Sequence, residues 1–192
     1  MLKKNLFIKN YMIFQCFFIN ANYNVQIIPL NENYKNEYKT LSEDDRILTQ
    51  NISIINEKKH DFHKQFQYYI SIKDPLSKKY ILLNEENKLI GYIGFFKNDT
   101  SPNIIFIYYA IIPSEWGKGL GTLAVKKFIE MFKDKLKQNG FKKIKATVKI
   151  QNIGSKKVLL KNKFILLLDE NNEPIIEYID DQSIVNTLEL NI

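Results

Sequence analysis

The chain contains one stretch whose residue types allow the backbone itself to bind a ligand. Residues 116–122 read Trp-Gly-Lys-Gly-Leu-Gly-Thr, between an apolar run at residues 104–112 and an amphipathic run at residues 120–139. Glycine leaves main-chain N–H groups uncovered and lets a ligand approach them closely. The first N–H groups of a helix have no intrahelical partner and lie at its positive end. The pattern therefore predicts a phosphate-binding turn, with a purely structural turn before a helix as the alternative.

Two common phosphate-binding motifs do not fit these glycines. A P-loop requires Gly, four residues and then Gly-Lys-Ser/Thr, an order that does not occur here. A dinucleotide fingerprint requires Gly-x-Gly-x-x-Gly with an acidic residue about 20 positions further on. The chain has Gly-x-Gly-x-Gly instead, and residues 140–145 are basic. The turn therefore belongs to another class of site.

The stretch resembles the acyl-CoA-binding loop of the GCN5-related N-acetyltransferase (GNAT) superfamily, which reads Arg/Gln-x-x-Gly-x-Gly/Ala. Trp116, Gly119 and Gly121 occupy the three fixed positions of that loop. Tryptophan at the first position departs from the general pattern. It is typical of the branch that resembles the ribosomal-protein N-terminal acetyltransferases, in which Trp-Gly-Lys-Gly follows a proline-containing turn such as residues 113–115 here.

A second segment supports the same resemblance. The family continues with Asn-x-x-Ser, a short helix and Lys-x-Gly-Phe, and Asn152, Ser155, Lys161 and Phe164 match at this spacing. Lys163 stands where the family prefers glycine, which puts the tight exit of that helix in doubt. The separation of the two motifs is also that of the family. The resemblance covers residues 24–178.

The resemblance implies the GNAT fold, which is of the α/β (α+β) class. Its central mixed, mostly antiparallel, twisted sheet of about six to seven strands is flanked by about four helices. The periodicity of apolar residues agrees with this order of elements. The expected strands are residues 25–30, 80–83, 89–96, 104–112, 143–150, 164–168 and 175–179, the last two forming a hairpin. The expected helices are residues 31–41, part of 46–73, 120–139 and a short helix from Ser155.

Length and composition fit one domain. We expect residues 23–180 to form a single acetyltransferase domain, with an N-terminal extension at residues 1–22 and a C-terminal tail at residues 181–192. Residues 1–22 weakly resemble a signal segment; the alternatives are a packed N-terminal extension and a start site assigned upstream of Met12. The segment is too short and too polar to span a membrane as a helix. A single cysteine, Cys16, excludes an internal disulfide framework, so we expect the reducing cytoplasm.

The formal net charge of +7 does not predict a nucleic-acid partner. Lysines recur on the polar side of nearly every expected element, whereas nucleic-acid modules concentrate basic residues in one patch. Nucleic-acid binding is therefore only a remote alternative. The two histidines, His60 and His63, lack the neighbouring ligands of a metal site, so we expect no metal.

The resemblance implies acetyl-CoA as the co-substrate. The residues expected to bind it are Ile111, Ile112, Trp116, Gly117, Lys118, Gly119, Leu120, Gly121, Thr122, Asn152 and Ser155. For the two isoleucines the expected contacts are main-chain contacts, and core packing explains their side chains. Asn152 is also explained as a plain helix cap. Ser155 either caps the same helix or faces the CoA sulfur, and the sequence does not separate the two.

The implied reaction is direct transfer of an acetyl group to a primary amine, such as a protein N-terminus, a lysine or a small-molecule amine. The catalytic acid and base stay unknown, because Phe106 replaces the glutamate that the family often has in its fourth strand and Leu159 replaces a tyrosine in its last helix. Tyr109 and Ser155 are the candidates for catalysis. The alternative function is a GNAT-fold protein that binds acyl-CoA without turnover. We expect a monomer or homodimer.

Overall fold

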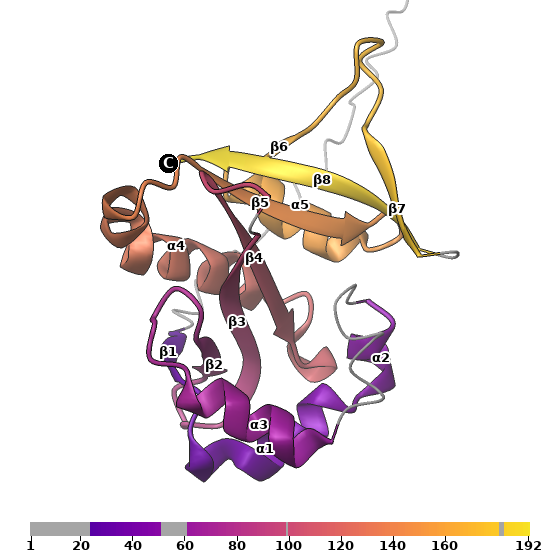
Figure 1. Ribbon diagram of the computed structural model, residues 1–192. Helices are drawn as coiled ribbons and strands as arrows, with labels where there is room; N and C mark the ends of the chain where they lie inside the picture. Colours follow the sequence, from indigo (N-terminus) through magenta and orange to yellow (C-terminus); the bar gives the residue numbers. More distant parts are fainter. Residues whose placement is uncertain (1–23, 51–60, 99, 181–182) are drawn as a thin grey trace, which may run out of the picture.

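The computed structural model describes residues 24–50, 61–98, 100–180 and 183–192, which are arranged around one mixed β-sheet (Figure 1). The predicted extension at residues 1–22 lies outside the described residues. The strands are β1 (Gln26–Pro29), β2 (Lys79–Leu83), β3 (Leu89–Lys97), β4 (Ile104–Ile111), β5 (Lys143–Lys149), β6 (Ile165–Leu166), β7 (Ile176–Asp180) and β8 (Ser183–Asn191). The helices are η1 (Glu32–Tyr34), α1 (Lys35–Ser42), α2 (Asp45–Leu48), α3 (Phe62–Ser71), η3 (Pro113–Glu115), α4 (Leu120–Gln138) and α5 (Ile153–Lys161).

The strands are ordered β1-β2-β3-β4-β5-β8-β6, and β7 also pairs with β8. Every pairing is antiparallel except that between β4 and β5. The predicted fold class is therefore confirmed, with eight strands and five α-helices in the described part of the chain. Within the same part, no helix is long and apolar enough to cross a membrane.

Each face of the sheet is covered by its own group of helices. On one face, α4 buries a stripe of residues that recur every four positions, and this stripe contacts Tyr80 and Phe95 of the sheet. On the other face, Tyr38 of α1 and Phe66 of α3 pack against Tyr92 and the neighbouring strands. Side chains of successive strand residues alternate between the two faces. A single strand such as β4 therefore contributes to both cores.

Residues 183–191 are not the tail that the sequence suggested. They form β8, which pairs with β5 along seven residues and with β6 and β7 on its other edge. Several of the buried residues of β8 are polar, which is why the segment resembles an exposed tail. Their partners come from distant elements: the Asn186 side chain donates to the Ile175 carbonyl, Thr187 donates to Glu177, and Glu189 lies 2.8 Å from Lys143.

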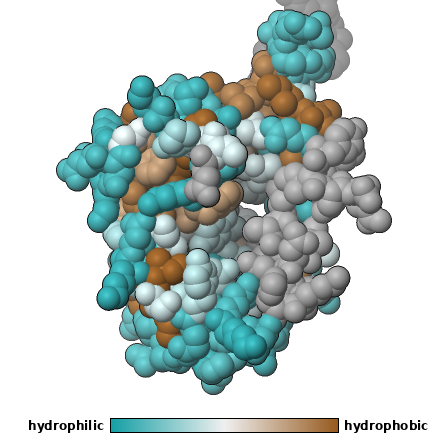
Figure 2. Space-filling view, viewed as in Figure 1, coloured by the Kyte–Doolittle hydropathy of each residue, from teal (hydrophilic) through white to brown (hydrophobic). Residues whose placement is uncertain are grey.

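The hairpin predicted from residues 164–168 and 175–179 forms only near its turn. An isolated bridge joins Leu168 to Pro174, but β6 and β7 pair with β8 rather than with each other. This segment projects from the rest of the chain in Figure 1. In Figure 2 hydrophobic side chains gather around its base, where Ile165, Leu168 and Ile176 are exposed.

The position of β8 between β5 and β6 predicts a large stability effect from its core side chain. Leu188 is fully buried, so Leu188→Ala should lower the free energy of unfolding by about 2–5 kcal/mol. Leu168→Ala is the matched control, because Leu168 is 46% exposed and should change stability by less than about 0.5 kcal/mol. Urea unfolding followed by circular dichroism measures both, and equal effects would show that β8 is not part of the core.

Candidate active site

The two parallel strands at the centre of the sheet separate after a short contact. Only three residue pairs join β4 to β5, from Ile104 with Lys143 to Phe106 with Lys145. Beyond Phe106, β4 continues to Ile111 and β5 continues to Lys149 without pairing to each other. The Ile112 N–H donates to the Ile90 carbonyl on the β3 side. Because the direction of the backbone groups alternates along a strand, those of the odd residues 107, 109 and 111 face the opening between β4 and β5.

The glycine turn lies directly after β4 and opens α4. Gly117 and Gly119 have φ of +78° and +80°, a left-handed backbone that glycine adopts without strain. A Cβ atom placed on either residue would meet nothing within 4 Å, so these glycines are required by backbone conformation and leave open space above them. Gly119 is the N-cap of α4 and has no side chain with which to cap it. The first N–H groups of α4 therefore face this open space without a cap from the N-cap residue.

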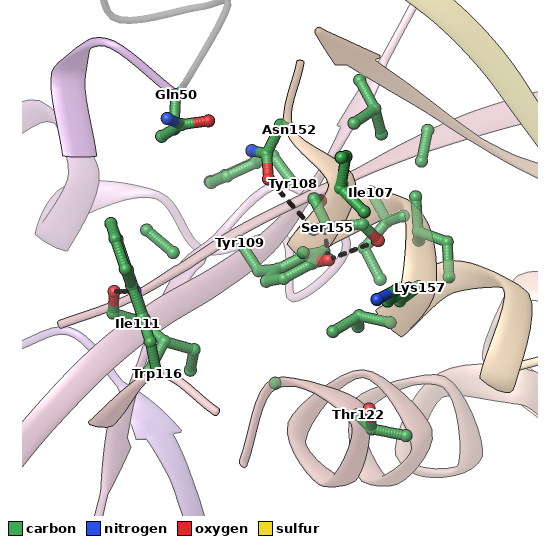
Figure 3. Close-up of a pocket in the computed structure, with 18 of the residues that line it drawn as sticks. Gln50, Ile107, Tyr108, Tyr109, Ile111, Trp116, Thr122, Asn152, Ser155 and Lys157 are labelled. Carbon is green, nitrogen blue, oxygen red and sulfur yellow. Dashed lines mark hydrogen bonds between the residues drawn. The ribbon is translucent and has the colours of Figure 1, made fainter. Parts of the chain in front are cut away.

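The third glycine has a different role. A Cβ on Gly121 would lie 3.3 Å from Val158 of α5 and 3.7 Å from Ile111. Gly121 therefore lets α4 approach both α5 and the end of β4. Trp116 closes the same end of β4, because its indole Nε1 donates to the Ile111 carbonyl at 2.6 Å (Figure 3). The tryptophan that departs from the family loop thus satisfies a backbone group that the separation of β4 from β5 leaves exposed.

The start of α5 forms a short chain of hydrogen bonds to β4. Asn152 is the N-cap, and its Oδ1 accepts from the Ser155 N–H at 3.0 Å. The Ser155 Oγ lies 2.8 Å from the Tyr109 hydroxyl, so the two candidates for catalysis are in direct contact (Figure 3). The structure thus shows Asn152 as a helix cap and Ser155 as a partner of both Asn152 and Tyr109. In Figure 3 the amide nitrogen of Asn152 points away from Ser155.

The surroundings of Tyr109 affect the ionisation of its phenol. Burial raises the pKa of the Tyr109 phenol above its ordinary range, and the hydrogen bond with Ser155 lowers it only in part. The phenol therefore stays protonated at neutral pH. A group in this state can donate a proton but cannot act as a base.

These elements surround a cavity of about 770 Å³, which is within the size range of small-molecule sites. It passes through the sheet where β4 and β5 separate. One half lies on the α4 and α5 side and is lined by Tyr109, Ile111, Ser155, Val158 and all residues of the turn at 116–122 except Lys118. The other half lies on the side of α1 and α2. It is lined by Ile47, Gln50, Phe96, Phe106, Tyr108 and Ala110.

Most residues expected to bind the cofactor line this cavity, but two do not. Ile112 is absent from the lining, and its N–H is used in the pairing with β3. Lys118 is also absent and forms an ion pair with Glu115 at 3.1 Å. The expected Ile111 contact is restricted to its N–H, because its carbonyl accepts from Trp116.

The structure adds lining residues that the sequence analysis did not select. Among them are Ile47, Gln50 and Phe96. The register of the β3–β4 hairpin pairs Phe96 with Phe106, and this signal could have identified Phe96. Gln50 follows a helix of four residues and carries no local signal.

Phe106 and Leu159, which replace the family's usual catalytic residues, pack against other apolar side chains. Phe106 stacks on Phe96 with ring centroids 4.9 Å apart, and Leu159 is fully buried in the core. Among the described residues, no group of three or more His, Cys, Asp or Glu side chains could hold a metal ion.

Comparison with known proteins identifies the family. The model of the acetyltransferase (GNAT) domain matches residues 30–165, so the chain belongs to this family of acetyl-CoA-dependent acetyltransferases, as the sequence motifs predicted. A search of curated protein sequences found no significant match.

Solved structures share the fold at low sequence identity. A spermidine N-acetyltransferase from Vibrio cholerae in complex with CoA and spermine has 15% identity and a TM-score of 0.67, over 87% of this chain and 95% of that chain. RimL, a ribosomal alpha-N-protein acetyltransferase in complex with coenzyme A, has 15% identity and a TM-score of 0.68, over 88% and 94% of the two chains. The putative acetyltransferase yncA from Salmonella typhimurium with acetyl-CoA has 16% identity and a TM-score of 0.62, over 87% and 93%.

The open space above Gly119 allows a test of the phosphate position. Gly119→Asp should lower the affinity for CoA by about 30-fold or more, because a carboxylate beside the α4 amides repels the diphosphate. Gly119→Asn is the matched control, since asparagine tolerates the left-handed backbone equally well and carries no charge. Calorimetry measures both affinities. Equal losses in the two variants would place the diphosphate elsewhere. Gly140→Asn, at a residue with the same φ of +80°, reports the cost of backbone strain alone.

The cap at Asn152 allows its structural and ligand roles to be separated. Asn152→Asp keeps an N-cap oxygen, so the melting temperature should not fall, but it removes the amide donor that points away from Ser155. Affinity for acetyl-CoA should then decrease by about 1 kcal/mol. Asn152→Ala should lose affinity and also about 1 kcal/mol of stability. Unchanged affinity in Asn152→Asp would leave Asn152 with a structural role alone.

Proposed function

We propose that the protein transfers an acetyl group from acetyl-CoA to a primary amine by direct transfer. The observation that carries this proposal is the convergence of three features on one cavity. These are the separated edge of β4, the start of α4 with its uncapped N–H groups, and the Tyr109–Ser155 pair. Such a cavity suits an extended, phosphate-bearing thioester, whose transfer depends on holding two reactants in line.

The residues present fit acetyl-CoA. Its diphosphate would bind the backbone amides at the start of α4, where Gly117 and Gly119 leave open space. Its pantetheine arm would lie along the edge of β4, hydrogen-bonded to the backbone of Tyr109 and the N–H of Ile111, as an added strand would be. Lys157 and Lys161 of α5 also line the cavity and add positive charge.

The Tyr109–Ser155 pair would supply the proton that the leaving thiolate needs. The amine nitrogen forms a bond to the thioester carbonyl carbon, and the bond from that carbon to sulfur breaks. Tyr109 donates its proton to the sulfur and regains a proton from water after the thiol has left. The Ser155 Oγ, 2.8 Å from the phenol oxygen, would hydrogen-bond that oxygen during the transfer. The amine loses its own proton to water, because Glu115 is the one carboxylate of the described lining and it is paired with Lys118.

One observation favours a second function, the binding of acyl-CoA without turnover. Phe106 and Leu159 stand where the family often has its catalytic glutamate and tyrosine, and both are apolar and packed. Release of free thiol from acetyl-CoA across a panel of primary amines separates the two functions. Tight CoA binding with no thiol release from any amine would support the second function and exclude the first.

The proposed proton donor predicts a specific kinetic effect. Tyr109→Phe should lower kcat by about 100-fold or more, while KM for acetyl-CoA changes little, because the phenyl ring keeps the packing and loses only the proton. Steady-state thiol release measures both constants.

Ser155→Ala is the companion variant. It removes the partner of the phenol but leaves the phenol in place, so its loss in kcat should be about tenfold or less. A Tyr109→Phe enzyme with unchanged kcat would remove Tyr109 from the mechanism. The raised pKa of Tyr109 also predicts that kcat does not fall through loss of this proton as pH rises from 7 to about 10.

A further inference from the structure

The half of the cavity on the α1 and α2 side is built from aromatic side chains. Phe96 and Phe106 are cross-strand partners whose rings stack 4.9 Å apart at an interplanar angle of 17°, and Tyr108 lies 6.3 Å from Phe96. Phe106 and Tyr108 are even-numbered residues of β4, so their side chains lie on the opposite face from Tyr109. Phe96 is 46% exposed although it lines the cavity. A flat apolar group can therefore bind against it without displacing core residues.

The charges of the described lining do not favour a polycation. Its one carboxylate, Glu115, lies on the turn after β4 and is held by Lys118. Lys157 and Lys161 of α5 carry positive charge. An acceptor with several ammonium groups would be repelled by these two lysines. Within the described lining, no unpaired carboxylate offsets that repulsion.

Gln50 supplies one neutral acceptor to the aromatic half. Its side-chain Oε1 is buried and has no hydrogen-bond partner within the described residues. Figure 3 shows this oxygen directed into the cavity, toward the side on which Asn152 lies. Since a buried carbonyl oxygen without a partner costs free energy, a ligand N–H is a suitable partner. Direct attack requires the amine to be neutral. An amide oxygen can accept one hydrogen bond from a neutral amine, and unlike a carboxylate it does not stabilise the charged ammonium form.

We infer that the acceptor is a monoamine whose primary amino group is attached through a short linker to an aromatic ring. Phe96 and Phe106 bind the ring, and the Gln50 Oε1 accepts a hydrogen bond from the amine. This inference rests on the proposed function and specifies its substrate class. Two sources share this chemistry, a free arylalkylamine and the amino end of a peptide that begins with an aromatic residue.

The test compares kcat/KM for five acceptors with saturating acetyl-CoA. 2-Phenylethylamine should exceed n-propylamine and spermidine by about tenfold or more, because only the first places a ring on the aromatic half. Two peptides of equal length, beginning with Phe or with Asp, form the other arm. If the peptide beginning with Phe exceeds 2-phenylethylamine, the source is a peptide; the reverse order assigns a small amine. Either order supports the inference as long as the aromatic acceptors lead.

Variants of Phe96 and Gln50 test whether these two residues determine the preference for an aromatic amine. Phe96→Ala should lower kcat/KM for 2-phenylethylamine by about tenfold and leave n-propylamine nearly unchanged. Tyr68→Ala is its matched control, because Tyr68 is 64% exposed on α3 and does not line the cavity. Gln50→Leu has a similar volume without the amide, and it should lower kcat/KM for both amines by a similar factor.

The outcomes distinguish failure of this inference from failure of the proposed function. A preference for spermidine or n-propylamine, or an equal effect of Phe96→Ala on all amines, would overturn the aromatic acceptor while acetyl transfer stands. Binding of CoA with no transfer to any of the five acceptors would overturn both. A preference for 2-phenylethylamine that Phe96→Ala abolishes would support the assignment.

Discussion

The separation of β4 from β5 is the constraint on which the rest of the site depends. After three residue pairs the two parallel strands diverge, and the backbone groups on one edge of β4 are left facing a cavity. Unpaired backbone groups inside a protein cost free energy. The chain satisfies one of them with the Trp116 indole and leaves others available to a ligand. The same separation lets one cavity reach both faces of the sheet.

The glycine turn and α5 close the site from the α4 side by different physical means. Gly117 and Gly119 provide a left-handed backbone and open space, whereas Gly121 provides close packing between α4 and α5. Asn152 fixes the start of α5, and this cap presents Ser155 to Tyr109. In the proposed mechanism this pair would take the place of the family's usual tyrosine, where this chain has Leu159, because a phenol from the facing strand reaches the first turn of the same helix.

The elements that sequence patterns identified well are those with a local physical signal. The amphipathic helix expected at residues 120–139 agrees with α4 to within one residue, and the strands expected at residues 80–83, 89–96 and 104–112 agree closely with β2, β3 and β4. The strand β8 was missed because its buried residues include Asn186, Thr187 and Glu189, whose partners lie in the segment before β7, in β7 and in β5, respectively. No local pattern reveals that such polar groups will be satisfied.

The sequence by itself determined the family, the glycine turn before α4 and the cap of α5, because each depends on residues within a few positions of one another. Only the tertiary structure decided which side chains share the cavity. Tyr109 and Ser155 are 46 positions apart, and Gln50 lies in the turn after the short helix α2 and belongs to no motif. Their meeting depends on strand register and on the packing of α5 and α2 around the opening in the sheet. These contacts are set by the burial of the whole core rather than by local spacing.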